Sequence, residues 1–135
     1  MTTVLVADDD PDVRDLITWK LERSGYLVLP AADGSSALDV LHEGQPDIAL
    51  LDIRMPGASG TEICRYVRTV PTLAHLPIIL VTASPMPGDL ELGLAAGADD
   101  YLLKPFSPRE LASRIAAVRP RPARPARING WTLRA

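Results

Sequence analysis

The chain has 135 residues, of which 47% are hydrophobic and 23% charged, with one cysteine and a formal net charge of −3. This balance is typical of one globular domain with a buried core and a short extension. Because no apolar run could cross a bilayer, the first residues form no leader and one cysteine cannot close a disulfide, we expect a cytoplasmic protein without a membrane partner.

Short apolar runs alternate with segments of helical period through residues 1–118. This alternation is typical of βα units and predicts a three-layer, doubly wound α/β fold with five parallel strands and helices on both faces. We expect strands at residues 3–7, 26–29, 48–52, 78–81 and 100–103. We expect helices at about residues 11–24, 34–42, 61–68, 89–96 and 107–118.

Helical periodicity predicts which side chains face the sheet. The predicted inward residues of the first and third helices are Val13, Leu16, Ile17, Leu21, Ile63, Cys64 and Val67. The fourth helix is weak, because prolines precede it and Gly93 interrupts it. Cys64 is expected in the core, and the lone His42 and His75 are expected on the surface.

Polar residues stand where four of the predicted strands end. They are Asp8, Asp9 and Asp10 after the first strand, Asp52 at the third, Thr82 at the fourth and Lys104 at the fifth. Because the carboxyl ends of parallel strands meet at one edge of a sheet, these residues predict a single site. An acid cluster, a lone acid, a hydroxyl and a lysine indicate binding of a divalent metal and a phosphoryl group.

The chemistry assigns a role to each group. Asp52 is the candidate nucleophile, because a carboxylate can attack phosphorus and form an aspartyl phosphate. Asp8 and Asp9 are candidate ligands for Mg²⁺, which needs few carboxylates and bridges to phosphate oxygens. Lys104 and Thr82 would contact the phosphoryl oxygens. Asp10 is left as the cap of the first helix.

Four segments together resemble the receiver domain of response regulators in two-component signalling. They are Val4–Asp10, Leu50–Gly57, Val81–Ala83 and Gly97–Phe106, which occur in the family's order and spacing across residues 1–118. The resemblance implies a flavodoxin-like sheet with strand order 2-1-3-4-5. It also implies that a sensor histidine kinase phosphorylates Asp52.

The resemblance further implies a ligand set and a switch. Mg²⁺ would be held by Asp9, Asp52 and the backbone carbonyl of Arg54, with Asp8 acting through water. Lys104 would contact the phosphoryl group through a position fixed by a cis bond to Pro105. Thr82 would move toward that group, and Tyr101 would swing into the space that Thr82 leaves.

The last residues differ in composition from the rest. Five arginines and no acid follow residue 118, and residues 119–127 are expected to be an extended Pro/Arg linker. Residues 128–133 carry an Asn-Gly turn signal and alternating apolar residues. They resemble the opening strand of the winged-helix effector domain in the OmpR/PhoB-like branch. We therefore expect residues 128–135 to begin a DNA-binding domain of a longer protein, a transcription regulator.

That branch implies a homodimer through the fourth helix, fifth strand and fifth helix when the domain is phosphorylated. Asp99 or Asp100 would pair with Arg114 across the interface. The sequence departs from the branch at Leu90, where a basic residue would pair with an acid at Glu110. The dimer geometry is therefore left open.

Two alternatives stand beside this interpretation. One is a Mg²⁺-dependent phosphohydrolase that turns over an aspartyl phosphate, but such enzymes use a second acid two residues after the nucleophile, where this chain has Arg54. The other is a receiver with an output other than DNA binding, against which only residues 128–133 argue. We therefore expect a signalling domain that catalyses only its own phosphorylation and dephosphorylation.

Overall fold

The computed structural model describes residues 1–83, 86–118, 126–128 and 131–133. Its five-stranded sheet is parallel and has the order β2-β1-β3-β4-β5, as the resemblance implied. The strands are β1 (Thr3–Ala7), β2 (Leu27–Ala31), β3 (Ile48–Asp52), β4 (Ile78–Thr82) and β5 (Asp100–Leu103). The predicted doubly wound α/β fold is confirmed.

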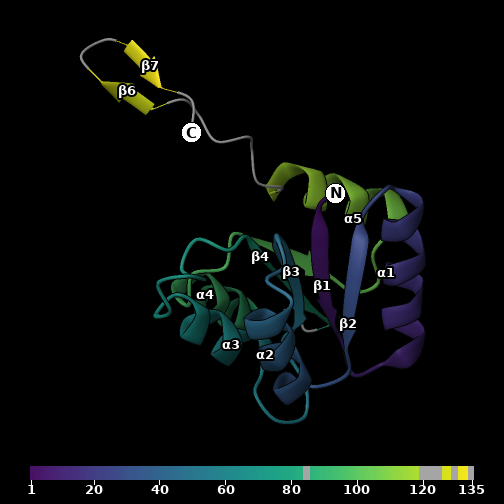
Figure 1. The fold of residues 1–135 in the computed structure, drawn as a ribbon. Coiled ribbons are helices and arrows are strands. Elements are labelled where there is room, and N and C mark those ends of the chain that lie inside the picture. Colours follow the sequence, from purple (N-terminus) through teal and green to yellow (C-terminus); the bar gives the residue numbers. More distant parts are fainter. Residues whose placement is uncertain (84–85, 119–125, 129–130, 134–135) are drawn as a thin grey trace.

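Five helices cover the two faces of the sheet (Figure 1). They are α1 (Pro11–Arg23), α2 (Gly34–Glu43), α3 (Gly60–Val67), α4 (Pro87–Ala95) and α5 (Pro108–Val118). Helices α1 and α5 pack on one face, and α2, α3 and α4 pack on the other (Figure 1). The three layers therefore enclose two apolar cores.

The central strand β3 supplies both cores, because successive side chains of a strand point to opposite faces. Ile48 and Leu50 lie in the core beneath α1 and α5, whereas Ala49 and Leu51 lie in the core beneath α2 and α3. All four are buried, as expected for a parallel sheet covered on both sides. A rigid central strand thus ends at Asp52.

Helix α1 begins and ends as the sequence predicts. The Asp10 carboxylate accepts hydrogen bonds from the backbone amides of Asp12 and Val13, and Pro11 occupies the first turn. Gly25 follows the helix with φ of 92°. The inward assignment of Leu16 is wrong, because its side chain is 50% exposed. Ile17 and Leu21, four residues apart, form the buried stripe.

Several predicted boundaries differ from the structure by one or two residues, such as the end of β4, which lies at Thr82 and not at Val81. Strand β2 starts one residue later than predicted and runs to Ala31, through Pro30. An edge strand tolerates proline because only one side of it must pair. Helix α3 starts at Gly60 because Ser59 and Glu62 form a reciprocal capping box. Helix α4 starts at Pro87, two residues earlier than predicted.

Two short strands follow the domain, β6 (Ala126–Ile128) and β7 (Trp131–Leu133). They pair antiparallel, with Ile128 opposite Trp131. The predicted Asn-Gly turn and most of the predicted linker lie outside the described residues. Among the helices that the structure describes, none has the length and apolar character to span a bilayer.

Candidate functional site

The polar strand ends predicted from the sequence do meet at one edge of the sheet. Strand pairing places Ala7 beside Leu51 and Asp52 beside Val81, so the ends of β1, β3 and β4 are neighbours. The backbone amide of Lys104 donates to the carbonyl of Thr82 at 2.8 Å, which fixes the end of β5 against β4. The site therefore rests on the sheet itself.

A hollow of about 600 Å³ opens at this edge. Its lining residues are Asp9, Asp10, Asp52, Arg54, Thr82, Ala83 and Lys104. Asp8 lies beneath it with 1% of its surface exposed, while Asp52 and Thr82 are 6% and 1% exposed. Buried carboxylates without full pairing are costly, so this arrangement needs a compensating cation.

Lys104 supplies part of that compensation. Its Nζ lies 2.9 Å from Asp8 Oδ2 and 3.1 Å from Asp52 Oδ2. Burial alone would lower the pKa of Lys104, but close contact with Asp8 and the charge on Asp52 outweigh it and raise that pKa. Lys104 therefore stays charged. The Lys104–Pro105 peptide bond is cis, as the resemblance implied.

Asp52 is held in an environment that disfavours its charge. Burial and the neighbouring carboxylate of Asp8 raise the pKa of Asp52, and they outweigh the opposing effects of Lys104 and the Arg54 amide. The Arg54 backbone N–H donates to Asp52 Oδ1 at 3.1 Å. One Asp52 oxygen thus meets an amide and the other meets the lysine, which fixes the plane of the carboxylate.

The acid pair before α1 is also fixed by local bonds. Asp8 Oδ1 accepts from the Asp10 amide at 3.0 Å, and Arg14 Nη1 donates to the Asp8 carbonyl at 2.7 Å. The other oxygen, Asp8 Oδ2, is buried and pairs with the Lys104 ammonium at 2.9 Å.

These acids fit a divalent cation. One carboxylate oxygen each from Asp8, Asp9 and Asp52 lie within 4.8 Å of one another, and elsewhere in the described chain no group of three such donors meets that criterion. Oxygen donors at this spacing suit Mg²⁺ or Ca²⁺. Lys104 alone pairs with Asp8 and Asp52, so the three clustered carboxylates keep an excess of negative charge that a cation would balance.

Tyr101 lies away from this cluster. Its side chain is half-buried against α4, where its hydroxyl donates to the backbone carbonyl of Asp89. Burial, with the nearby charge of Asp89, raises the pKa of Tyr101, so the hydroxyl keeps its proton. In this structure the Tyr101 hydroxyl is therefore hydrogen-bonded to the backbone of α4.

The predicted interface acids are engaged within the chain. Asp100 pairs with Arg114, whose Nη1 lies 3.1 Å from both carboxylate oxygens. Asp99 instead accepts from Arg68 Nη2 at 3.0 Å and from the Ile78 amide at 2.8 Å. Of the two acids, Asp99 thus has a partner that the sequence did not suggest.

The sequence analysis missed two residues that shape the site, Arg14 and Gly60. A Cβ on Gly60 would lie 2.5 Å from the Asp52 carbonyl oxygen, so the loop after β3 can fold back only over glycine. The available signal was the glycine after Ser59, at the start of a helix. Nothing in the order of residues pointed to Arg14, because its bond to Asp8 depends on packing.

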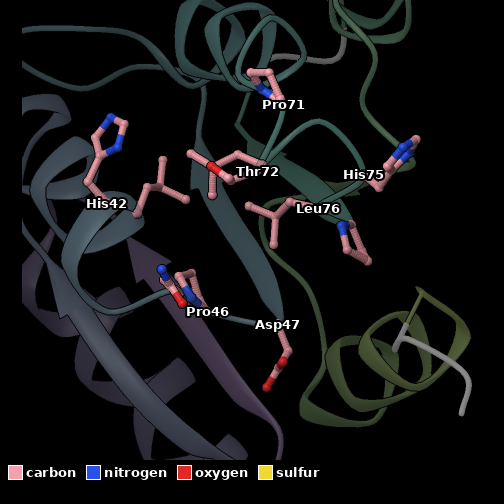
Figure 2. A pocket seen from close by; sticks show the side chains of 11 residues that line it. His42, Pro46, Asp47, Pro71, Thr72, His75 and Leu76 are labelled. Atoms are coloured by element: carbon pink, nitrogen blue, oxygen red, sulfur yellow. The ribbon is translucent and has the colours of Figure 1, made fainter. Parts of the chain in front are cut away.

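A second hollow, of about 510 Å³, lies at the opposite edge of the sheet, before β3 and β4 (Figure 2). His42 and His75 stand well apart in its lining (Figure 2). His42 Nε2 is 2.9 Å from the Tyr66 hydroxyl. Both histidines are exposed, as predicted, and they share no ligand site.

Residues 4–116 match the family described as response regulator receiver domain. The chain belongs to this receiver family. Phosphorylation by a histidine kinase is general for receiver domains, and their acidic site binds Mg²⁺. The receiver fold predicted from the sequence is thereby confirmed, whereas the winged-helix branch stays a prediction.

Solved structures of other receiver domains have the same fold as this chain. The chain is similar to chemotaxis protein CheY4 of Vibrio cholerae, with 33% identity and a TM-score of 0.83 over 87% of this chain and 98% of that chain. It is similar to a response regulator from Chloroflexus aurantiacus, with 38% identity and a TM-score of 0.83 over 87% and 96%. It is also similar to the receiver domain of a sensor histidine kinase from Pseudomonas aeruginosa, solved with a magnesium ion coordinated in its active site cleft, with 33% identity and a TM-score of 0.80 over 87% and 96%.

Proposed function

We propose that this receiver domain accepts a phosphoryl group from a sensor histidine kinase on Asp52. The observation that carries the proposal is the convergence of the buried Asp52 carboxylate with Lys104, Thr82 and the acid pair at one strand edge. Asp52 Oδ1 and Oδ2 are both held, so the carboxylate faces the hollow in one orientation. Orientation of the nucleophile is a large part of phosphoryl transfer.

The metal site is part of the same proposal. Asp9, Asp52 and the Arg54 carbonyl would bind Mg²⁺ directly, and Asp8 would act through water. Mg²⁺ supplies positive charge between the attacking carboxylate and the phosphoryl oxygens. Lys104 keeps a second positive charge at the site because its pKa is raised by its two acids.

Phosphorylation would then bias two side chains. Thr82, buried at the end of β4, would move its hydroxyl toward a phosphoryl oxygen. Tyr101 would leave its bond to the Asp89 carbonyl and swing toward the space that Thr82 vacates. A group that bonds only one arrangement shifts the population toward it.

The output that we propose is a homodimer through the face formed by α4, β5 and α5. Asp100 on β5 and Arg114 on α5 belong to that face, and Asp99 directly precedes β5. The intramolecular Asp100–Arg114 pair would have to exchange for a pair between chains. Arg68 competes for Asp99, which favours Asp100 as the acid that changes partner.

We also propose a transcription regulator, with residues 1–118 as receiver, 119–127 as linker and 128–135 as the start of a winged-helix domain that contacts DNA. The antiparallel pairing of β6 with β7 is compatible with an opening hairpin of that domain, and β6 begins at Ala126, two residues before the proposed boundary. The buried free thiol of Cys64 supports a reducing compartment, the cytoplasm.

Intact mass spectrometry tests the phosphoryl transfer. The chain is incubated with acetyl phosphate with and without Mg²⁺, and the wild type is compared with Asp52→Asn and Asp39→Asn. Asp39 is an exposed acid on α2 and serves as the matched control. We expect one phosphoryl adduct in the wild type and Asp39→Asn, dependent on Mg²⁺ and labile to hydroxylamine, and none in Asp52→Asn. A folded wild type without an adduct would contradict the proposal, and rapid turnover of a phosphate ester would favour a phosphohydrolase.

A further inference from the structure

Helix α4 contains a glycine that its helical conformation does not require. Glycine in a helix interior is unfavourable, so Gly93 needs a reason in the packing. Gly93 is buried, and an added Cβ would lie 2.8 Å from the Tyr101 hydroxyl oxygen, 2.9 Å from Tyr101 Cε2 and 2.7 Å from Leu80 Cδ1. The Tyr101 ring therefore occupies the space that any other residue at position 93 would fill.

The hydroxyl of Tyr101 is fixed to the same helix. It donates to the carbonyl of Asp89, which stands four residues before Gly93. A half-buried phenol needs such a partner, and the bond ties the end of the ring to the α4 backbone. Gly93, the Asp89 carbonyl and Leu80 together form what we call the Tyr101 seat.

We propose that Gly93 is a positioning residue whose lack of a side chain creates the Tyr101 seat and so holds Tyr101 against α4 in the unphosphorylated domain. This inference rests on the proposed function, in which Tyr101 moves upon phosphorylation. The seat adds a cost to that movement, because the Asp89 bond and the contact with Gly93 must both be lost. The occupancy of the seat thus sets how readily the domain switches.

The surroundings determine what a side chain at position 93 would displace. Leu80 is fully buried within the sheet core, where close packing opposes a shift of its side chain. Tyr101 is half-buried and lies next to solvent, so its ring moves instead. Gly93→Ala should therefore empty the seat and favour the switched arrangement.

The chain provides a matched control in the same helix. Gly88 also lies in α4, but an added Cβ there meets nothing within 4 Å. Gly88→Ala makes the same chemical change without touching Tyr101. An effect shared by both variants would report on helix propensity and not on the seat.

The wild-type protein gives the direct test. NMR spectra should contain a nuclear Overhauser contact between the Gly93 α-protons and the Tyr101 ring, and saturating Mg²⁺ with beryllofluoride, a phosphoryl mimic, should abolish it. A contact that persists while beryllofluoride binds would overturn the inference and leave the proposed function intact. Failure of beryllofluoride to bind would overturn the proposed function and this inference with it.

A second test measures coupling between the two residues. Gly93→Ala should bind beryllofluoride about fivefold more tightly than the wild type, since a lost hydrogen bond is worth about that factor. Gly88→Ala should bind as the wild type does. In a Tyr101→Ala background Gly93→Ala should have no effect, and an equal effect in both backgrounds would overturn the inference.

A further variant tests the inference independently if Gly93→Ala fails to fold. Tyr101→Phe keeps the ring and removes only the hydroxyl that bonds to Asp89. It should also bind beryllofluoride more tightly. Unchanged affinity in Tyr101→Phe would contradict a seat that restrains switching.

Discussion

Asp52 combines burial with a neighbouring acid, and both raise its pKa. The folded chain therefore favours the protonated form more than the unfolded chain does. In Mg²⁺-free buffer the resulting stability is fully present below the unfolded-state pKa and is lost as pH rises through the raised folded-state pKa. We measure the free energy of unfolding of the wild type and of Asp52→Asn by urea denaturation. As pH rises through the folded-state pKa, we expect the wild type to lose stability relative to Asp52→Asn. Parallel curves for the two proteins would contradict the raised pKa.

Asp8 is fully buried, and its negative charge repels that of Asp52 and so raises the pKa of Asp52. Asp8→Asn removes one of three clustered carboxylates, so it should stabilise the metal-free protein by about 1 kcal/mol and abolish the stabilisation by Mg²⁺. Thermal melts with and without Mg²⁺ measure both effects. Asp10→Asn is the control, because asparagine also caps a helix and Asp10 is outside the acid cluster. A Mg²⁺ response retained in Asp8→Asn would contradict a role for Asp8 in the metal site.

At the scale of elements, the success of the sequence analysis followed the strength of each local signal. Strands β1, β3 and β5 were predicted with their observed bounds, because charged or turn residues follow each of them, whereas β4 extends one residue further, to Thr82. Strand β2 was placed too early, since its pairing with β1 continues through Pro30 to Ala31. Leu16 was placed inward because an apolar stripe drawn from sequence is wider than the contact that one helix makes.

The site was predictable where position alone defines it. Asp52 and Thr82 end a strand, Asp8 and Lys104 directly follow one, and parallel strands end at one edge. The hydrogen-bond partner of each group could not be predicted from the sequence. The bonds from Arg68 connect segments far apart in the chain, and only packing brings those segments together.

Arg68 joins three segments on one side of the sheet. After α3, its guanidinium donates to the carbonyls of Ala74, Leu76 and Gly97 and to the Asp99 carboxylate. Arg68→Ala would leave these acceptors without their donor. We expect a loss of about 2–3 kcal/mol in the free energy of unfolding, measured by urea denaturation, because bonds from a charged donor are among the stronger ones.

Hydrogen exchange should localise the same effect. The amides of residues 97–99 should exchange faster in Arg68→Ala, since the loop between α4 and β5 loses its anchor. Arg65→Ala is the control, because Arg65 is an exposed arginine on the preceding turn of α3. Equal stability of the two variants would show that the Arg68 bonds do not hold this loop.

For the whole molecule, the face of α4, β5 and α5 is the surface through which we propose that the domain dimerises. Its elements carry exposed leucines, Leu92 and Leu94 on α4 and Leu103 on β5, and the Asp100–Arg114 pair joins β5 to α5. Apolar side chains near charged pairs are typical of protein interfaces. The basic residue that the related branch places at Leu90 is absent, so apolar contacts would have to supply more of the proposed dimer's affinity.

The proposed dimer can be tested by a charge placed on that face. Leu94→Glu puts a carboxylate where a 58% exposed leucine stands on α4. We expect it to weaken the dimer formed with Mg²⁺ and beryllofluoride at least about tenfold, by light scattering, because burying an unpaired charge costs more than the 1.4 kcal/mol of one decade. Leu27→Glu changes a leucine of similar exposure, 51%, on the far edge strand β2, and should dimerise as the wild type does. If both variants accept a phosphoryl group and dimerise equally, the interface lies elsewhere on the domain.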